Sequence, residues 1–394
     1  MFLQLNSEEK DMLNGKFGKA IKKSMEIITT LGEIYGATKL VKVSSVQVAG
    51  VSYENLGEAG LEFLDEMAAD GRVRVLTTLN PAGMDMENWK ELGIDSEFAK
   101  NQIRVIEAFE KMGVISTCTC TPYFIGNIPR FGEHIAWSES SAVCYANSII
   151  GARTNREGGP SALAAALTGK TAEYGLHLDK HRIPELTVVV ETKISKTYEF
   201  GALGKSIGDE VGGKIVYIKG IDDASIEELK SFCASIATYG GTPMFYMEGI
   251  SPESKIIKIP KEKIKITKEN IEKNINELND ESEVDFISIG CPHCSIKEIA
   301  EIADLLKGKK VNKELWITTA RPIKEIADRM GYSKIIKSSG AKLACDTCCV
   351  VAPIKGRFKT LCTDSAKGCY YARGKNKFNT RFNSIEKCIE EALN

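Results

Sequence analysis

Apolar residues recur along this chain with two alternating periods. Short runs rich in Val, Ile and Thr are typical of strands buried on both faces, and they occur at residues 40–48, 73–79, 186–190 and 284–290. Between these runs, apolar residues recur every three or four positions, as they do on one face of a helix. This spacing predicts helices at residues 8–35, 56–69, 97–112, 138–151, 161–168 and 225–239. Strands that alternate with helices predict an α/β fold with parallel sheets.

Two changes in composition suggest where the chain divides. Residues 195–220 contain six glycines and are interpreted as a loose segment that crosses between domains. Residues 255–279 are rich in Lys, Ile and Glu, and we expect a solvated linker followed by a helix. We therefore expect an α/β domain at residues 1–195, a middle α/β segment at 196–280 and a further α/β domain at 281–394.

The overall charge excludes several classes of protein. The 394 residues carry a formal net charge of -1 and 43% of them are hydrophobic, which argues against disorder and against a nucleic-acid binder. No uncharged apolar run is long enough for a transmembrane helix, so no membrane partner is expected. The first residues lack the basic start and apolar core of a signal peptide, so a cytoplasmic location is expected.

Twelve cysteines are the unusual feature of the composition. In a long chain without a signal peptide, reduced thiols that bind metal are favoured over disulfides. Three clusters lie in turns that follow strand-like runs, and the carboxyl ends of parallel strands converge on the ligand crevice of an open α/β sheet. We therefore expect three thiol-bearing loops to meet. The clusters are Cys118 with Cys120, Cys291 with Cys294, and Cys345 with Cys348 and Cys349.

Spacing alone leaves three interpretations of these thiols open. Cys291–Cys294 and Cys345–Cys348 are both C-x-x-C pairs, which together would suit a zinc site, although they lie about 50 residues apart. One pair alone would suit thioredoxin-like redox chemistry. One thiolate from each loop would suit an iron–sulfur cluster, and three ligands on a four-iron cluster leave one iron open as a Lewis acid.

Polar loops near the predicted strand ends are candidates for substrate binding. The loops at residues 50–52 and 80–81 follow strands and precede helices, where backbone N–H groups can bind an anion, although ordinary turns would look the same. The run around Glu139 is either a helix cap, with Ser138 as the N-cap residue, or a substrate contact made by Glu139 and Ser140. His134 and His293 are candidate proton carriers or ligands, and each would more often be structural.

Basic residues in polar turns could bind an anionic group. Arg153 and Arg156 flank a glycine-rich turn, where a guanidinium can bind a carboxylate or phosphate through two hydrogen bonds. Lys367 follows Ser365 in a similar turn. A solvated surface cation is the alternative interpretation for each of them.

Five sequence runs resemble the aconitase X family across essentially the whole chain. They are TCTCTPY at residues 117–123, GEHIAWSESSA at 132–142, GARTNREGGPS at 151–161, GCPH at 290–293 and DTC at 346–348. The resemblance implies aconitase-like, three-layer α/β/α domains around an iron–sulfur site. It also implies a separate small subunit, similar to the swivelling domain of aconitases, that completes the active site and supplies a serine as the base.

The resemblance also implies site residues. The cluster ligands would be Cys120, Cys291 and Cys348, with Cys118 an alternative to Cys120, on a 4Fe-4S cluster or, since three thiolates also suit it, a 2Fe-2S cluster. Catalysis would use these thiolates through the cluster, together with Glu139 and Ser140. The substrate-binding residues would be Gly50, Val51, Ser52, Asn80, Pro81, Ser138, Glu139, Arg153 and Lys367.

Two dehydrations are known in this family. One branch, largely bacterial, dehydrates cis-3-hydroxy-L-proline. An archaeal branch dehydrates (R)-5-phosphomevalonate to trans-anhydromevalonate 5-phosphate in a mevalonate pathway of isoprenoid biosynthesis. This chain ends near residue 394 without a fused swivelling domain and is rich in Lys and Ile, as in the archaeal large subunits. We expect the large subunit of a hydro-lyase acting on the phosphorylated hydroxy acid, with the hydroxyproline reaction and a zinc-stabilised binding protein as alternatives.

Overall fold

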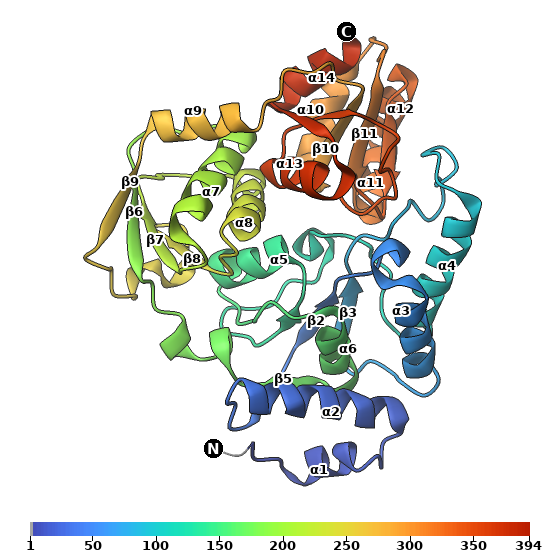
Figure 1. Cartoon of the computed structure of the whole chain (residues 1–394), viewed down its shortest axis with the longest axis vertical. Coiled ribbons are helices and arrows are strands. Elements are labelled where there is room, and N and C mark those ends of the chain that lie inside the picture. Colours follow the sequence, from blue (N-terminus) through green and yellow to red (C-terminus); the bar gives the residue numbers. More distant parts are fainter. Residues whose placement is uncertain (1–2) are drawn as a thin grey trace.

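The computed structural model describes residues 3–394, which form three α/β units around a common centre (Figure 1). In the first unit, at the bottom of Figure 1, parallel strands have the order β3-β2-β4, and β1 pairs antiparallel with β5. Its elements are α1 (Ser7–Leu13), α2 (Lys19–Ile34), β1 (Leu40–Lys42), β2 (Ser45–Val48), α3 (Tyr53–Ala68), β3 (Leu76–Leu79), α4 (Ser96–Lys111), β4 (Ala136–Trp137), α5 (Ser140–Tyr145), α6 (Gly159–Thr168) and β5 (Lys170–Ala172).

The second unit, at the left of Figure 1, is a parallel sheet of order β8-β7-β6-β9 with helices packed against it. Its strand β6 lies within the predicted segment 1–195 but pairs with β7 and β9. The elements are β6 (Leu186–Val190), α7 (Thr197–Val211), β7 (Val216–Lys219), α8 (Ile226–Tyr239), β8 (Phe245–Met247), β9 (Lys263–Ile266) and α9 (Lys268–Glu277).

The third unit, at the upper right of Figure 1, is a parallel sheet of order β12-β11-β10-β13-β14 between helices. Its elements are β10 (Phe286–Cys294), α10 (Ile296–Leu306), β11 (Glu314–Thr319), α11 (Arg321–Arg329), α12 (Tyr332–Ser339), β12 (Lys342–Cys345), β13 (Thr360–Thr363), α13 (Ala366–Tyr371), β14 (Asn379–Phe382) and α14 (Ile385–Leu393). The predicted α/β fold with parallel sheets is therefore confirmed.

Several predicted elements differ in detail. The predicted helix at residues 8–35 is two helices, because Gly15 and Gly18 between them have φ values of +81° and +103°. The predicted strand at residues 40–48 is two strands that belong to two different sheets. The helix expected at residues 225–239 is confirmed, with Ser225 and Glu228 forming its capping box.

The largest difference concerns the glycine-rich segment 195–220, which is not loose. Most of it is the buried helix α7, and its glycines allow α8 to approach closely. A Cβ at Gly204 would lie 2.7 Å from Ser235 Cβ, and one at Gly208 would lie 2.7 Å from the backbone nitrogen of Gly240. The glycines therefore make a helix–helix contact that a larger residue would block.

Apolar packing crosses the boundaries between the units. One core combines Trp137 and Tyr145 of the first unit with strands and helices of the second. Another combines Met84 of the first unit with Phe286 and Trp316 of the third, whose rings are 5.2 Å apart edge to face. Shared apolar cores thus join the first unit to the second and to the third.

Chain order reverses at one point in the first sheet and at one point in the third. In the first sheet, β3 pairs with one edge of β2 and the later strand β4 pairs with its other edge. In the third sheet, β11 and the later strand β13 pair in the same way with the two edges of β10. Ligands of open α/β sheets bind at such switch points, beyond the carboxyl ends of the strands. The segments at these ends are residues 49–52, 138–140, 290–294 and 363–367.

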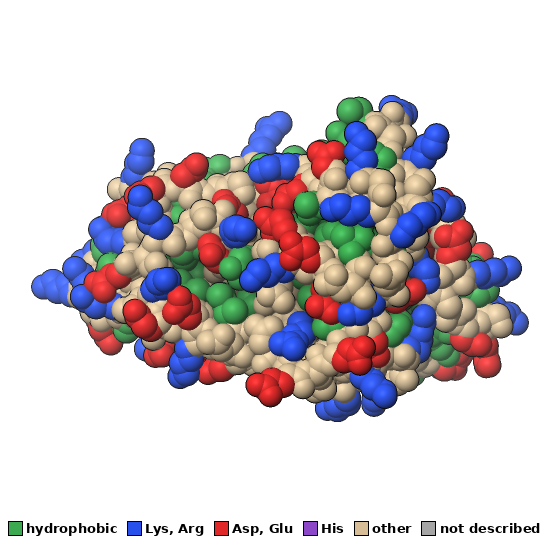
Figure 2. Space-filling view, turned by 90° about the horizontal axis from the view of Figure 1, so that it is seen from above, with side chains coloured by type: hydrophobic (Ala, Val, Ile, Leu, Met, Phe, Trp, Pro, Cys, Tyr) green, Lys and Arg blue, Asp and Glu red, His purple; other side chains and the backbone are tan. Residues whose placement is uncertain are grey.

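The surface agrees with the near-zero net charge. Acidic and basic side chains are interspersed over the face seen in Figure 2, apart from a group of acidic side chains near its middle. No helix within residues 3–394 has the length and apolar character needed to cross a bilayer.

Candidate active site

Three buried thiols from three loops lie near one another where the first and third units meet. Cys120, Cys291 and Cys348 have exposed fractions of 8%, 9% and 5%. Burial raises the pKa of Cys120, and negative charge on Glu139 and Cys348 raises it further. Burial also raises the pKa of Cys348, with a further contribution from Cys291. The charge of Cys348 thus acts on Cys120 and the charge of Cys291 acts on Cys348, which places Cys348 near both of the other thiols.

The surroundings of these thiols suit metal-bound thiolates. The backbone N–H of His293 donates to Cys120 Sγ at 3.2 Å. Backbone N–H groups of Val350 and Val351 lower the pKa of Cys348 against the larger effect of burial. Hydrogen bonds to the sulfurs stabilise their anionic form and tune an iron–sulfur cluster. The residues present thus fit the cluster that the sequence predicts.

The neighbouring cysteines lie in different surroundings. Burial raises the pKa values of both Cys118 and Cys345, and the charge of Asp346 raises them further. Among residues 3–394, no three His, Cys, Asp or Glu side chains are grouped closely enough to hold a single metal ion, so the two C-x-x-C pairs do not form a zinc-type site there.

An ion-paired network anchors the loop that carries Cys348. Arg321 pairs with Asp346 and, at 2.9 Å, with Asp85 from the loop after β3. The other oxygen of Asp85 accepts from the backbone N–H of Cys345 at 2.8 Å. Burial, followed by the charge of Asp85, raises the pKa of Asp346 to about 6, although Arg321 opposes the shift. The loops after β3 and β12 are therefore joined through charged groups.

Glu139 and Lys367 form a buried ion pair beside the thiols. Lys367 Nζ donates to Glu139 Oε1 and, at 3.3 Å, to Ser140 Oγ. The other carboxylate oxygen accepts from Ser141 Oγ at 2.5 Å and from the backbone N–H of Ala142 at 2.7 Å, which caps α5.

The charges of this pair are fixed. Burial alone would raise the pKa of Glu139, but Lys367 and the hydrogen bonds outweigh it and lower the pKa to about 2. Burial alone would lower the pKa of Lys367, but Glu139 and then Cys291 raise it. A carboxylate that stays ionised with both oxygens occupied is suited to orienting Lys367 rather than to carrying a proton.

A cleft of about 210 Å³ opens beside this pair. Three of its side chains are cationic and Glu139 is the single carboxylate. Arg156 makes no ion pair within residues 3–394, whereas Lys375 pairs with Glu54 at 2.5 Å. The lining residues are Ala49, Asn55, Asn80, Ser138, Glu139, Ser140, Arg156, Val350, Val351, Lys367, Tyr371 and Lys375.

Five of the predicted substrate or catalytic residues line the cleft, namely Asn80, Ser138, Glu139, Ser140 and Lys367. The buried Oδ1 of Asn80 has no hydrogen-bond partner in the described chain, so it is free to accept from a bound molecule.

The other predicted contacts are placed differently. Gly50, Val51, Ser52 and Pro81 are not among the lining residues, and Ser52 Oγ instead donates to the backbone oxygen of Val351 at 3.1 Å, beneath the cleft.

The structure places the two arginines of the glycine-rich turn differently. Arg153 does not line the cleft, because its backbone bridges to His134 and its side chain pairs with Asp179 at 2.5 Å. Arg156, three residues later, lines the cleft. His134 Nδ1 lies 2.9 Å from His177 Nδ1 and also lies outside the cleft lining.

Sequence reasoning missed Asn55, Tyr371 and Lys375 as lining residues. Each follows a switch-point loop by a few residues in the next helix, and that position is the one signal that would have indicated them.

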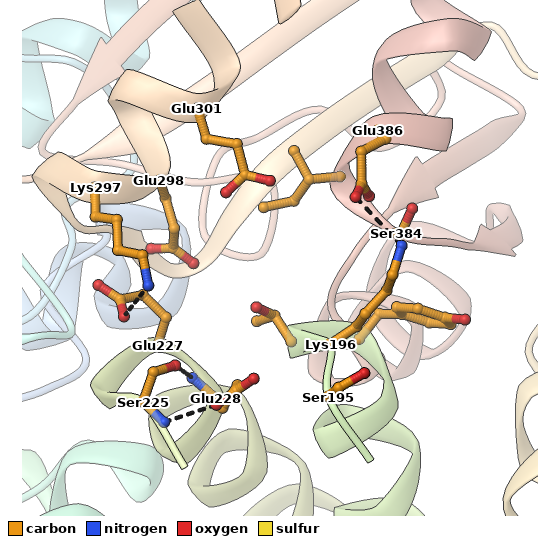
Figure 3. A pocket seen from close by; sticks show the side chains of 13 residues that line it. Ser195, Lys196, Ser225, Glu227, Glu228, Lys297, Glu298, Glu301, Ser384 and Glu386 are labelled. Carbon is orange, nitrogen blue, oxygen red and sulfur yellow. Dashed lines mark hydrogen bonds and ion pairs between the residues drawn. The ribbon is translucent and has the colours of Figure 1, made fainter. Parts of the chain in front are cut away.

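A second cavity, of about 280 Å³, lies between the second and third units (Figure 3). Side chains from α10 and α14 face side chains from the starts of α7 and α8 across it. Most of its charged groups already have partners in caps and ion pairs, such as Lys196 with Glu386 at 3.3 Å. None of the predicted site residues lines it.

Three α/β units, of which the first and third supply the buried thiols and the charged cleft, define an aconitase-like protein. Family models of the aconitase X first, second and third domains match residues 2–180, 184–276 and 284–394. The chain therefore belongs to the aconitase X family.

Curated relatives and a solved structure agree. The chain is 45% identical to the phosphomevalonate dehydratase large subunit of Methanocaldococcus jannaschii over 98% of this chain and 100% of the relative. It is 31% identical to the cis-3-hydroxy-L-proline dehydratase of Pseudomonas aeruginosa over 99% of this chain and 70% of that protein. The crystal structure of Thermococcus kodakaraensis aconitase X in its holo-form superposes with a TM-score of 0.93 at 43% identity, covering 99% of this chain and 100% of that one.

Proposed function

We propose that this chain is the large subunit of a hydro-lyase that dehydrates (R)-5-phosphomevalonate to trans-anhydromevalonate 5-phosphate in isoprenoid biosynthesis. The relatives named phosphomevalonate dehydratase large subunit reach 45% identity, whereas the hydroxyproline dehydratases reach 31%. Its reduced thiols suit the cytoplasm, where we place the reaction.

The charge of the cleft favours phosphomevalonate over hydroxyproline as the substrate. Lys367 is balanced by Glu139 and Lys375 by Glu54, whereas Arg156 makes no ion pair among the described residues, so the cleft keeps one unbalanced positive charge. Phosphomevalonate has two anionic groups, a phosphate and a carboxylate, and both pair well with cations. Hydroxyproline is a zwitterion, and its ammonium group would meet the same cations unfavourably.

Cys120, Cys291 and Cys348 would hold the cofactor, which we propose is a 4Fe-4S cluster. When bound with one iron open, such a cluster supplies a Lewis acid for the departing hydroxyl group. Lys367 keeps its positive charge because of Glu139 and lies near Cys291, so it offsets negative charge between thiolate and substrate. Ser140 and Asn80 offer polar groups that orient the substrate.

The proton alpha to the carboxylate needs a base, and we propose that a small swivelling-domain subunit supplies it. The relatives are named as large subunits, which implies such a partner. No His lines the cleft formed by the described residues, and Glu139 is held ionised with a pKa of about 2, too low for an effective base at neutral pH.

The test is anaerobic co-expression of both subunits, followed by dehydration assays with phosphomevalonate and with cis-3-hydroxy-L-proline. We expect turnover of the first only. C291S should lose bound iron and turnover, and C388S, which changes a buried thiol next to Cys362, is the matched control. Turnover of hydroxyproline alone would refute the proposed substrate, and full activity of C291S would refute the ligand assignment.

A further inference from the structure

His293 uses all of its polar atoms on partners from the three units. Its ring Nε2 lies 2.9 Å from the backbone oxygen of Thr347, and its Nδ1 lies 2.9 Å from Thr119 Oγ1. Its backbone N–H donates to Cys120 Sγ at 3.2 Å, and its backbone oxygen accepts from Lys230 Nζ at 3.0 Å. The side chain is fully buried, with an exposed fraction of 0%.

The partners fix the state of the ring. The backbone oxygen of Thr347 can only accept, so Nε2 carries the hydrogen and donates. Nδ1 then accepts from the hydroxyl of Thr119. Neither ring nitrogen of His293 remains available as a metal ligand or proton carrier.

The positions of these partners in the sequence are informative. Thr119 immediately precedes Cys120, Thr347 immediately precedes Cys348, and His293 itself follows Cys291 by two residues. One imidazole ring is therefore hydrogen-bonded to the loops of all three thiols.

Lys230 supports the same residue from the second unit. With an exposed fraction of 2%, it donates to the backbone oxygens of His293 at 3.0 Å and Pro292 at 3.3 Å. Its charge is balanced by Glu298 at 2.6 Å, which lies at the start of α10. The Cys291 loop is therefore held from the ring side and from the backbone side.

We infer that His293 is a positioning residue that fixes the relative places of the three thiols, an inference that rests on the proposed cluster ligands. When a group that holds a metal ligand by a hydrogen bond is replaced, the metal affinity typically falls about 10- to 100-fold. The ring thus acts on the cluster through the loops and needs no contact with substrate.

The experiment compares variants of the full chain, co-expressed anaerobically with its small subunit and reconstituted with iron and sulfide. H293F removes both ring hydrogen bonds at similar volume, H293Q retains a donor for Thr347, and T119V removes only the hydroxyl. H181F, at an exposed histidine, is the matched control. The readouts are iron and sulfide per chain, the electron paramagnetic resonance spectrum, the rate of iron loss to a chelator, and thermal unfolding of the apo chain.

We expect H293F to lose iron about 10- to 100-fold faster with an altered spectrum, T119V to fall between H293F and the wild type, and H293Q to recover part of the retention. Wild-type iron loss and spectrum in H293F would overturn the inference. If H293F does not fold, wild-type behaviour of both T119V and H293Q would overturn it. C291S distinguishes failure of the proposed ligand set from failure of the role of His293. Iron retention in C291S refutes the ligand set, whereas iron retention in H293F alone refutes the role of His293.

Discussion

Replacing Lys367 with Met should leave Glu139 as a buried charge without its counterion. The two side chains have exposed fractions of 9% and 5%, so bulk water compensates little for the missing ammonium. Removing one partner of a buried pair typically costs about 3–5 kcal/mol of the free energy of unfolding. The carboxylate keeps its bonds to Ser141 and Ala142, which places the expected loss at the lower end, about 3 kcal/mol.

A double-mutant cycle in urea at pH 7, on the apo chain, isolates this interaction. K367M and E139Q should each destabilise, whereas K367M/E139Q should lose at least about 2 kcal/mol less than the sum of the single variants. K16M is the matched control, since Lys16 and Asp11 are 2.8 Å apart but exposed at 66% and 40%, and it should cost under about 1 kcal/mol. Additive single variants would refute the reasoning.

The pH dependence of the free energy of unfolding provides a second test of the same ion pair. In the wild type, the pKa of Glu139 is lowered to about 2, so its stabilisation is present above the unfolded value and is lost as the pH falls toward 2. Without Lys367, burial raises this pKa instead, and the destabilisation should shrink as acid protonates Glu139. A K367M penalty that does not change between pH 7 and pH 4 would contradict this account.

Three further outcomes follow from other sites. R156Q should raise KM for phosphomevalonate about 10- to 100-fold in steady-state assays, whereas R153Q should leave KM unchanged because Arg153 is outside the cleft lining. G204A should cost about 1–3 kcal/mol in urea unfolding because its Cβ meets α8, and G374A, which meets no atom within 4 Å, should not. Burial, and then nearby charges, lowers the pKa of His177 to about 3, so the unfolded chain binds more protons below pH 6.5. Thermal melts should show a loss of about 2 kcal/mol by pH 5 that H177Q removes.

The sequence predicts that the three thiol-bearing loops meet, because parallel strands end at the same edge of a sheet. Cys291 lies in the last part of β10 and Cys348 follows β12, and the sequence pattern marks the runs before both residues as strands. The choice between Cys118 and Cys120 was beyond the pattern, since neighbouring positions of an irregular loop have no periodicity. The structure shows one backbone difference between the two positions, a φ of +43° at Cys118, and the assignment of Cys120 as the ligand stays a prediction.

Two other features could not be predicted from the sequence, because they depend on contacts between distant segments. Residues 195–220 have the composition of a loop, yet Gly204 and Gly208 are in a helix because α8 needs the space. Arg153 and Arg156 are equivalent in a turn of unknown geometry, and only the bridge to His134 and the pairing with Asp179 separate them. Local sequence propensity contains no information about these distant contacts, so tertiary packing overrides it.

The Glu139–Lys367 pair supplies a fixed positive charge to the site and takes no part in proton transfer. A lone buried lysine would lose its proton, because burial favours the neutral amine. Glu139 prevents this, so Lys367 remains a fixed cation beside Cys291 and the cleft. The same interaction removes both groups from proton transfer at neutral pH, since neither carries a pKa near 7. Glu139 and Lys367 therefore help to bind an anionic hydroxy acid but cannot remove its proton. The base must come from outside the cleft lining, and this is the physical reason to expect a second subunit over the opening.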